Sequence, residues 1–474
     1  MTKFLDPLDS SFILLENAGT AMNIGAVIEL DWGETSDPKE RFELIRKNIA
    51  ERIHEIPVLT QRVVRAPFDM TWPILVRDER FDLDRHVVRV ALPSPGSGAQ
   101  FDDLVAEILS RTLSPQRPLW QLIVLEGLED GRAALVLKVH HSLADGVSGA
   151  ETFANLFDIS PTVRSPEAHG DADDEEETVT TSLGLLRQGL RRLRQRPELI
   201  VDGVLSWGRR FVEILGALLR VLSARGRRRA AGHQPSIFEA RRTSLNGAAG
   251  IEKLYYRTRV PLADAKRAAK SRDASVTDFV LATTSGALRR LLEDRGEILK
   301  KDLVALVPIN VRGEGAIADL GNQISGMLVA LHTDVADPEE RIRAISTDAL
   351  QTLGEQRAHR AKIFQDVPRV LGPTLVSLGG KIVSAFGLFD LVPMANLMIS
   401  SVPGPPIPLW LSGHRVASAA PVGPLFGAIS LNVTVLGFEE NLEFGLLGCA
   451  DRMSDLAILR DYIYEEATAL IEAT

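Results

Sequence analysis

The sequence predicts an α/β protein built from two domains. Its 474 residues exceed the length over which one hydrophobic core usually extends, so two cores are expected. In both halves of the chain, short apolar runs of strand length alternate with longer segments of helical periodicity. An acidic stretch at residues 161–182, with almost no apolar side chains, separates the two halves.

The first domain is assigned to residues 1–160. Strands are predicted where Val, Ile and Leu predominate, at residues 23–30, 87–92, 122–125 and 133–139. Helices are predicted from 3.6-residue periodicity at residues 38–53, 101–113 and 148–157. Ser148 is a candidate N-cap for the last of them.

Residues 161–245 are assigned to the connection between the domains, in two parts. Six Asp and Glu residues between positions 171 and 177 predict a disordered acidic linker. From residue 183 to 229, apolar side chains alternate with arginines. This pattern is typical of a basic amphipathic helix on an anionic membrane surface. The same pattern also fits a crossover helix that packs on the core and exposes its basic face to solvent.

The second domain is assigned to residues 246–474. Apolar side chains at helical spacing predict a core helix from residue 276 to 291. The apolar stretch 368–392 is interrupted by charged residues and glycines, so a hydrophobic helix pair is expected there rather than a membrane span. Strands are predicted at residues 303–311, 327–331, 396–401, 430–436 and 442–447.

The composition excludes several classes of function. The chain has 54 Lys and Arg against 63 Asp and Glu, and its net charge of −9 argues against general nucleic-acid binding. Its single cysteine, Cys449, excludes an internal disulfide and fits a reducing cytosol. No apolar signal-peptide core begins the sequence. CxxC, HExxH and Walker-type motifs are absent, so neither a metal nor a bound cofactor is expected.

The clearest chemical signal is the HHxxxDG motif formed by His140, His141, Asp145 and Gly146. It follows the predicted strand 133–139 directly, so the two imidazoles stand where a buried strand ends. This arrangement is used by enzymes that move acyl groups from a thioester to a hydroxyl or amine, with a neutral imidazole taking the acceptor's proton. The alternative is a pair of packed strand-end histidines with Asp-Gly as a simple turn.

Further motifs resemble the bacterial wax ester synthase/diacylglycerol acyltransferase family, in its actinobacterial triacylglycerol synthase branch. The PLW motif is Pro118-Leu119-Trp120, and a VPGPP segment spans residues 402–406. An LNVTV segment spans residues 431–435, and FDLDRHV occupies residues 81–87. HHxxxDG alone is shared with condensation domains, whereas PLW, VPGPP and LNVTV in this order are far more specific to the family.

The resemblance implies two similar domains of the CoA-dependent, chloramphenicol acetyltransferase-like type, joined by a crossover linker, with a channel between them. It assigns the role of general base to His141, with His140 and Asp145 largely structural and Gly146 keeping the channel open.

The resemblance also implies a substrate-binding role for PLW. Pro118, Leu119 and Trp120 would shape the acyl-binding side, or form a rigid turn anchored by a buried aromatic. Asn432 is a further candidate for substrate binding. Asn432 and a backbone N–H near Gly146 are also candidates for donating to the oxyanion.

The implied reaction transfers a long acyl chain from acyl-CoA to diacylglycerol, and acyl-CoA is a substrate rather than a cofactor. The implied location is the cytoplasm, at the inner face of the plasma membrane or at lipid inclusions. Alternatives are a wax ester synthase using fatty alcohols, a condensation-type acyltransferase, and a catalytically silent lipid-binding homologue. The chain departs from the family at Thr277-Asp278, where Asn-Asp is frequent, and at Gln121, where an acid is common.

Overall fold

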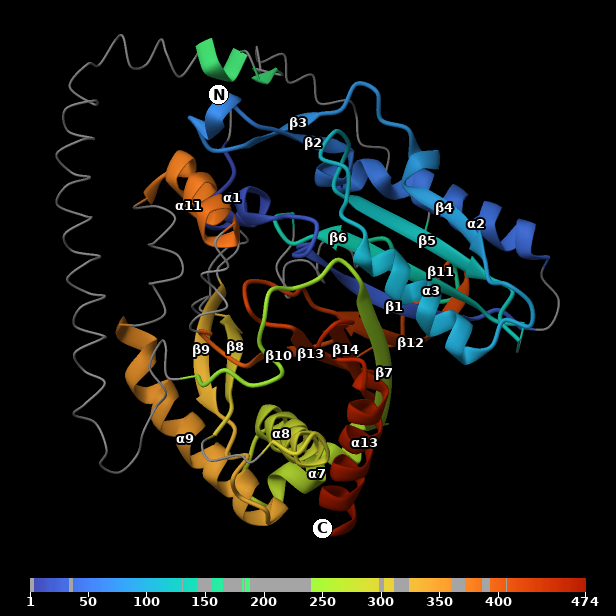
Figure 1. Cartoon of the computed structure of the whole chain (residues 1–474). Helices are drawn as coiled ribbons and strands as arrows, with labels where there is room; N and C mark the ends of the chain where they lie inside the picture. The colour runs from blue at the N-terminus through green and yellow to red at the C-terminus, as the bar shows by residue number, and fades with distance from the viewer. Residues whose placement is uncertain are drawn as a thin grey trace, which may run out of the picture.

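The computed structural model contains two six-stranded sheets and a separate two-stranded hairpin, with helices packed around them (Figure 1). This arrangement confirms the predicted α/β class with two sheet-rich domains. The structure describes residues 4–33, 37–129, 131–143, 155–164, 181–182, 184–187, 240–297, 302–310, 324–359, 371–385, 393–405 and 407–474.

The first sheet has the strand order β11-β12-β1-β6-β5-β4. Helix α2 (Pro38–Arg52) packs on one face through Ile45 and Ile49, and α3 (Gly98–Ser110) packs on the other through Phe101 and Val105. The strands are β1 (Asn23–Asp31), β4 (Val87–Ala91), β5 (Trp120–Glu126), β6 (Ala133–His140), β11 (Trp410–Leu411) and β12 (His414–Val422).

Two strands of the first sheet come from the far end of the sequence. β12 pairs antiparallel with β1, with Gly25 opposite Val422 and Asp31 opposite Arg415. Strand β11 then pairs with β12 and forms the sheet edge. The first sheet is therefore completed by residues that follow most of the second sheet in the sequence.

The second sheet has the strand order β7-β14-β13-β10-β8-β9. Its helices bury their apolar sides against one face in a single large cluster of side chains. The strands are β7 (Lys253–Pro261), β8 (Val304–Asn310), β9 (Ile324–Ala330), β10 (Leu397–Pro403), β13 (Leu431–Phe438) and β14 (Asn441–Cys449). The helices are α7 (Leu262–Lys270), α8 (Val276–Asp294), α9 (Pro338–His359) and α13 (Leu456–Glu472).

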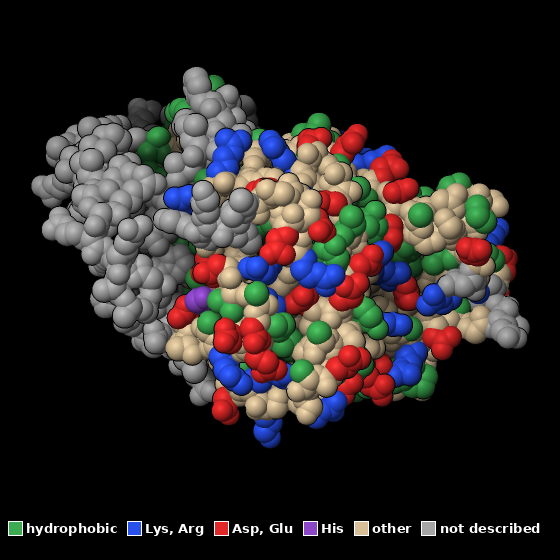
Figure 2. Space-filling view, turned by 60° about the horizontal axis from the view of Figure 1, so that its bottom comes forward, with side chains coloured by type: hydrophobic (Ala, Val, Ile, Leu, Met, Phe, Trp, Pro, Cys, Tyr) green, Lys and Arg blue, Asp and Glu red, His purple; other side chains and the backbone are tan. Residues whose placement is uncertain are grey.

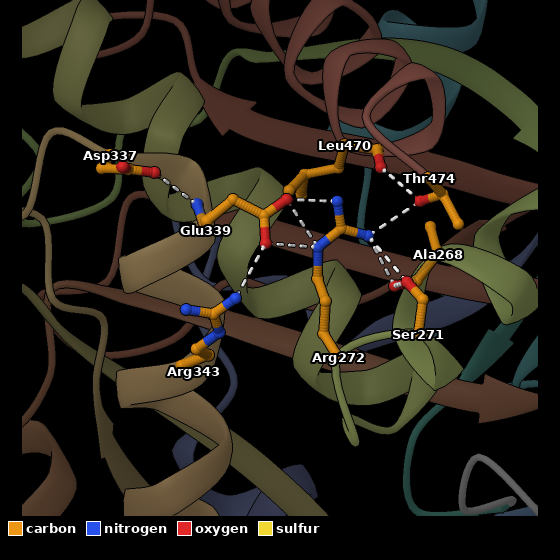
Figure 3. A network of polar contacts seen from close by, with 8 residues as sticks. All are labelled: Ala268, Ser271, Arg272, Asp337, Glu339, Arg343, Leu470 and Thr474. Carbon is orange, nitrogen blue, oxygen red and sulfur yellow. Dashed lines mark hydrogen bonds and ion pairs between the residues drawn. The ribbon is translucent and has the colours of Figure 1, made fainter.

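A buried arginine joins three of these helices (Figure 3). The Arg272 guanidinium donates to the Ala268 carbonyl at 2.7 Å and to the Thr474 hydroxyl at 2.9 Å. Its Nε also donates to both carboxylate oxygens of Glu339, at 2.8 and 2.9 Å. This hydrogen bond holds the pKa of Glu339 below its ordinary value. The network fixes the end of α7 to the start of α9 and to the C-terminus that follows α13.

A smaller group of elements lies beside the first sheet. It comprises helix α1 (Pro7–Leu15), the hairpin β2 (Gln61–Val64) with β3 (Ile74–Arg77), the short helix η3 (Pro67–Asp69) and helix α11 (Pro373–Ala385). Figure 1 shows α11 lying against α1 at the upper left. Within the described ranges, none of the helices is long and apolar enough to cross a membrane.

The end of the molecule that lies opposite α1 and α11 has a surface of mixed charge. Figure 2 turns this end, which carries the C-terminal helices, toward the viewer. Lysine and arginine side chains are interspersed there with aspartate and glutamate, and the apolar side chains occur in small groups.

Several element boundaries differ from those predicted. Helix α3 begins at Gly98 rather than residue 101, because Ser97 and Gln100 form a reciprocal capping box. Of the helix predicted at 148–157, only residues 155–157 are described, and these form a turn. Ser148, residues 165–180 of the acidic linker and nearly all of the basic amphipathic segment lie outside the described residues.

Candidate active site

The two histidines of the motif stand where β6 ends. His140 is opposite Asn23 of β1 in the sheet register, and its backbone N–H donates to the Leu119 carbonyl at 2.9 Å. The N–H of His141 donates to the Met22 carbonyl at 2.7 Å. The backbone of both histidines is therefore fixed by the neighbouring chain on either side of the strand.

His140 is buried and neutral. Its Nδ1 accepts a hydrogen bond from the backbone N–H of Ser142 at 3.1 Å, and the Ser142 hydroxyl lies 2.7 Å from the same atom. An Nδ1 that accepts from a backbone N–H carries no proton, so the ring proton is on Nε2. Burial, followed by the influence of His141, lowers the pKa of His140 to about 3.

His141 is more accessible and is held by an aromatic contact. Its side chain is half-buried, and its ring stacks on Phe12 of α1 with the centroids 4.4 Å apart. The remaining members of the motif, Asp145 and Gly146, lie outside the described residues. Of the two imidazoles, His141 is therefore the more accessible.

Two charged side chains that the sequence analysis missed support this strand end. Glu16 accepts the backbone N–H of Met22 at 3.0 Å and lies 3.6 Å from the Nε2 of His140; burial raises the pKa of its carboxyl.

The second of these side chains is Lys138, which is buried. It donates to the Ile108 carbonyl at 2.8 Å and also to the Arg111 carbonyl at the end of α3. Burial lowers its pKa to about 8. A lysine inside the apolar run 133–139 was the only sequence signal for this contact.

The PLW segment supports the same strand end from β5. Pro118 and Leu119 are buried, and the Leu119 carbonyl is the one that accepts from His140. Trp120 is fully buried, and its indole N–H donates to the Leu59 carbonyl at 2.7 Å. Its ring stacks on His86, with centroids 4.8 Å apart. In this arrangement Trp120 is an anchor of the core that fixes the backbone beside His140.

Asn432 lies in the second sheet, close to the end of β12. Its amide donates to the Pro424 carbonyl at 2.9 Å and to the Met398 sulfur at 3.1 Å. Val422 at the end of β12 is opposite Gly25 of β1, and Gly25 is opposite Lys138 of β6. Two strand spacings of about 4.8 Å therefore separate the β12 end from Lys138, two residues before His140. Both amide hydrogens are in use, so donation to an oxyanion requires release of the sulfur, which is a weak acceptor.

The two family departures fall at ordinary structural positions. Ser275 caps α8, and the backbone N–H of Asp278 donates to its hydroxyl at 3.1 Å. Asp278 in turn accepts the backbone N–H of Ser275 at 2.8 Å. Thr277 is therefore inside the first turn rather than at the cap. Gln121 pairs with Lys138 across β5 and β6.

One cluster in the described part of the chain has metal-ligand character. The ligand atoms of Asp302, His332 and Asp334 lie within 4.8 Å of one another. His332 already contacts Asp348, with Nε2 2.8 Å from a carboxylate oxygen. Burial, followed by Asp334, raises the pKa of Asp302 to about 6. The cluster belongs to the β8–β9 edge of the second sheet, not to the histidine pair.

Comparison with known families identifies the chain. Residues 5–280 match the model of the wax ester synthase/diacylglycerol acyltransferase catalytic domain. Residues 320–470 match the model of the C-terminal domain of the same family. The chain belongs to the wax ester synthase/diacylglycerol acyltransferase family. The resemblance inferred from the sequence motifs is thereby confirmed.

Individual relatives agree with this assignment. A Mycobacterium tuberculosis protein named for diacylglycerol O-acyltransferase activity, tgs1, is 29% identical over 98% of this chain and 95% of its own. A second M. tuberculosis relative with the same kind of name is 30% identical over 99% of this chain and 97% of its own. The family and these relatives make the protein an O-acyltransferase.

Solved structures support the fold. The wax ester synthase/diacylglycerol acyltransferase of Marinobacter aquaeolei VT8 superimposes with a TM-score of 0.68 at 23% identity, covering 99% of both chains. The first condensation domain of the calcium-dependent antibiotic synthetase gives a TM-score of 0.56 at 16% identity, covering 99% of this chain and 97% of that one. The predicted fold of the CoA-dependent acyltransferase type is confirmed, whereas the channel between its domains remains a prediction.

Proposed function

We propose that the protein is a long-chain acyl-CoA:diacylglycerol O-acyltransferase that makes triacylglycerol, with His141 as general base. The observation that carries this proposal is the division between the two imidazoles. His140 is buried and neutral with its Nδ1 occupied by Ser142, while His141 is half-buried at the strand end. The names of the mycobacterial relatives support diacylglycerol as the acceptor.

In the proposed reaction, the His141 imidazole takes the proton of the acceptor hydroxyl as its oxygen attacks the thioester carbonyl carbon. A positioned general base of this kind contributes roughly 10²–10⁴-fold. The carbon–sulfur bond of the tetrahedral intermediate then breaks, and the proton passes from the imidazolium to the departing CoA thiolate. The atoms balance between acyl-CoA, alcohol, ester and free CoA, so the chemistry requires no cofactor.

The other candidate residues have supporting roles in this scheme. Asp145 orients the His141 imidazole or holds its loop, and Gly146 leaves room for the substrate to approach. Pro118, Leu119 and Trp120 keep the start of β5 in place beside His140. This side of the sheet is the proposed place for the acyl chain.

The oxyanion needs donors, and two candidates are proposed. One is a backbone N–H near Gly146. The other is the amide of Asn432, if the Met398 sulfur releases it.

The substrates imply where the enzyme works. Acyl-CoA is amphiphilic and diacylglycerol is confined to membranes, so an enzyme that joins them must reach a lipid surface. We infer that it acts on the cytoplasmic side, in peripheral contact with the inner face of the plasma membrane or with lipid inclusions. Nucleic acid has no part in this function, in keeping with the chain's net charge of −9.

The deciding experiment offers purified protein palmitoyl-CoA with either diacylglycerol or hexadecanol. We expect triacylglycerol as the main product, and at least a hundredfold loss of rate in His141→Ala. His54→Ala, which changes an exposed histidine, is the matched control and is expected to retain full activity.

The outcome separates the alternatives. Wax ester as the main product would move the assignment to wax ester synthase, which the family description also includes. Turnover only with acyl groups on a carrier protein would favour a condensation-type reaction, to which the shared fold also belongs. Lipid binding without turnover, unchanged in His141→Ala, would identify a silent homologue.

A further inference from the structure

Five large apolar side chains are exposed on neighbouring elements of the structure. Phe68 is 86% exposed and Leu378 is 50% exposed, and three further side chains are exposed by more than a third. We call this set the apolar face: Leu15 of α1, Phe68 and Met70 at η3, and Leu378 and Ile382 of α11.

Direct contacts hold these elements together. Helix α11 lies against α1 (Figure 1), and the approach is close at Gly380. A Cβ atom on Gly380 would lie 2.3 Å from the end of the Leu15 side chain, so the two helices are in close contact there. The Thr374 hydroxyl donates to the Asp69 carbonyl at 2.9 Å, which ties α11 to η3.

Helix α11 has opposite sides of different character. Val376 and Ser377 are buried, whereas Leu378 and Ile382, one turn apart, are exposed together with Lys381. The helix contains no acidic residue between 373 and 385. Its exposed side is therefore apolar with one positive charge.

Phe68 has an unusual backbone conformation. It adopts the left-handed conformation with φ 56° and ψ 18°, which is unusual for a bulky residue and persists only when the surroundings enforce it. The next residue, Asp69, also has a positive φ of 51°. Its carboxylate accepts two hydrogen bonds from Arg65, at 3.0 and 2.8 Å. Phe68 thus combines an unusual backbone conformation with a ring that is 86% exposed.

The apolar face adjoins the candidate active site through α1. Phe12, on the same helix as Leu15, stacks on the His141 ring. Phe12 and Leu15 are three positions apart, so their side chains are neighbours on the surface of α1. Helix α1 therefore connects the apolar face to the proposed general base.

We propose that the apolar face docks on an anionic phospholipid bilayer and that diacylglycerol reaches His141 from there past α1. This inference rests on the proposed function, because it names the surface that supplies the acceptor. Aromatic and leucine side chains with a nearby lysine are the combination that binds the interface of an anionic membrane. Among the described residues at the end that carries the C-terminal helices, the apolar side chains occur in small groups between charges (Figure 2).

The first test measures binding without activity. The full-length protein is sedimented with vesicles of phosphatidylcholine and phosphatidylglycerol, as wild type and with the substitutions Phe68→Ser, Leu378→Ser and Ile382→Ser combined. We expect at least a tenfold weaker partition for this variant. Because all three side chains are exposed, the fold should be unaffected, and circular dichroism checks this.

A matched variant changes three exposed apolar residues elsewhere. Leu44→Ser, Ile458→Ser and Tyr464→Ser affect side chains that are 41%, 45% and 51% exposed on α2 and α13. This control should bind vesicles like the wild type. Equal binding by the apolar-face variant and the wild type would overturn the proposal, and so would a wild type that does not bind vesicles. A change in oligomeric state without a change in vesicle binding would also overturn it, in favour of a second copy of the chain.

The second test measures turnover with acceptors presented in two ways. With diacylglycerol in vesicles, the apolar-face variant should lose at least tenfold in rate. With a short-chain diacylglycerol in solution, it should match the wild type. Equal losses with both acceptors would contradict docking. No turnover by the wild type with either acceptor would refute the proposed function, while the sedimentation result would still decide whether the face binds lipid.

Discussion

Two adjacent imidazoles have different environments because they stand at a strand end, where consecutive side chains point to opposite sides. His140 points into the protein, where Ser142 occupies its Nδ1 and burial lowers its pKa to about 3. His141 points the other way, toward Phe12. One strand end thus places a buried imidazole and a more accessible one in successive residues.

The low pKa of His140 predicts a pH-dependent stability. An unfolded histidine has a pKa of about 6.5, so between pH 6.5 and about 3 the unfolded chain binds a proton that the folded chain does not. The free energy of unfolding therefore falls as the pH falls through this window, by about 2 kcal/mol between pH 7 and pH 5. Urea unfolding of the wild type and of His140→Gln at the two pH values measures it.

The His140→Gln variant should lose less stability than the wild type over the same pH interval, although it is less stable at pH 7. His54→Gln, at an exposed position, should keep the pH dependence of the wild type. If the wild type and His140→Gln lose equal stability between pH 7 and pH 5, another group is responsible for the acid sensitivity.

At this scale the sequence motifs identified the candidate site but not the charged residues that support it. The histidine pair and PLW were both found from their motifs. Glu16 and Lys138 were not, because their contacts join residues distant in the sequence: Lys138 reaches a helix end 27 positions earlier. A lone charge in an apolar run indicates burial with a partner, yet it does not identify the partner.

At the scale of elements, the two sheets meet where β12 contacts β14. The hydroxyl of Tyr255 in β7 is fully buried and donates to the Pro421 carbonyl of β12 at 3.1 Å. At Gly445 of β14 the backbones approach so closely that a Cβ atom would lie 1.8 Å from the Pro421 carbonyl oxygen. The absence of a side chain at Gly445 is therefore a condition for the two sheets to touch.

This contact predicts that alanine substitutions at two glycines of neighbouring strands differ in their effect on the free energy of unfolding. Gly445→Ala should lower the free energy of unfolding by at least about 3 kcal/mol, because its methyl group forces the sheets apart. At Gly437 of β13 a Cβ atom would meet only the Leu262 side chain, at 3.6 Å. Gly437→Ala should therefore change stability by less than about 1 kcal/mol. Urea unfolding of both variants tests the contact, and similar values for the two would contradict it.

Sequence periodicity predicted the central strands of both sheets but missed β7, β12 and the small hairpin. Strand β12 is rich in small residues and contains Pro421, so it lacks the Val, Ile and Leu run that marks β6. Strand β7 carries three basic residues among its apolar ones. Both strands are stabilised by pairing with partners far along the sequence, which local propensity does not report.

At the scale of the whole molecule, the pairing of β12 with β1 makes the two domains interdependent. Residues 414–422 complete the sheet that residues 1–160 begin. Without them the entire length of β1 would become a sheet edge, with a row of unpaired backbone groups and apolar side chains that include Val27 and Ile28. Such an edge promotes aggregation.

We therefore expect a fragment ending at residue 164 to fail to fold alone, although it contains the HHxxxDG motif. It should elute as aggregates in size-exclusion chromatography and lack the near-ultraviolet circular dichroism of the full chain. The full chain should unfold in one transition, because β12 belongs to the first sheet and also contacts the second. Loss of β12 therefore destabilises both sheets at once. A monomeric fragment with native-like circular dichroism would show instead that β12 is dispensable for the first sheet, and that the two halves are stable independently.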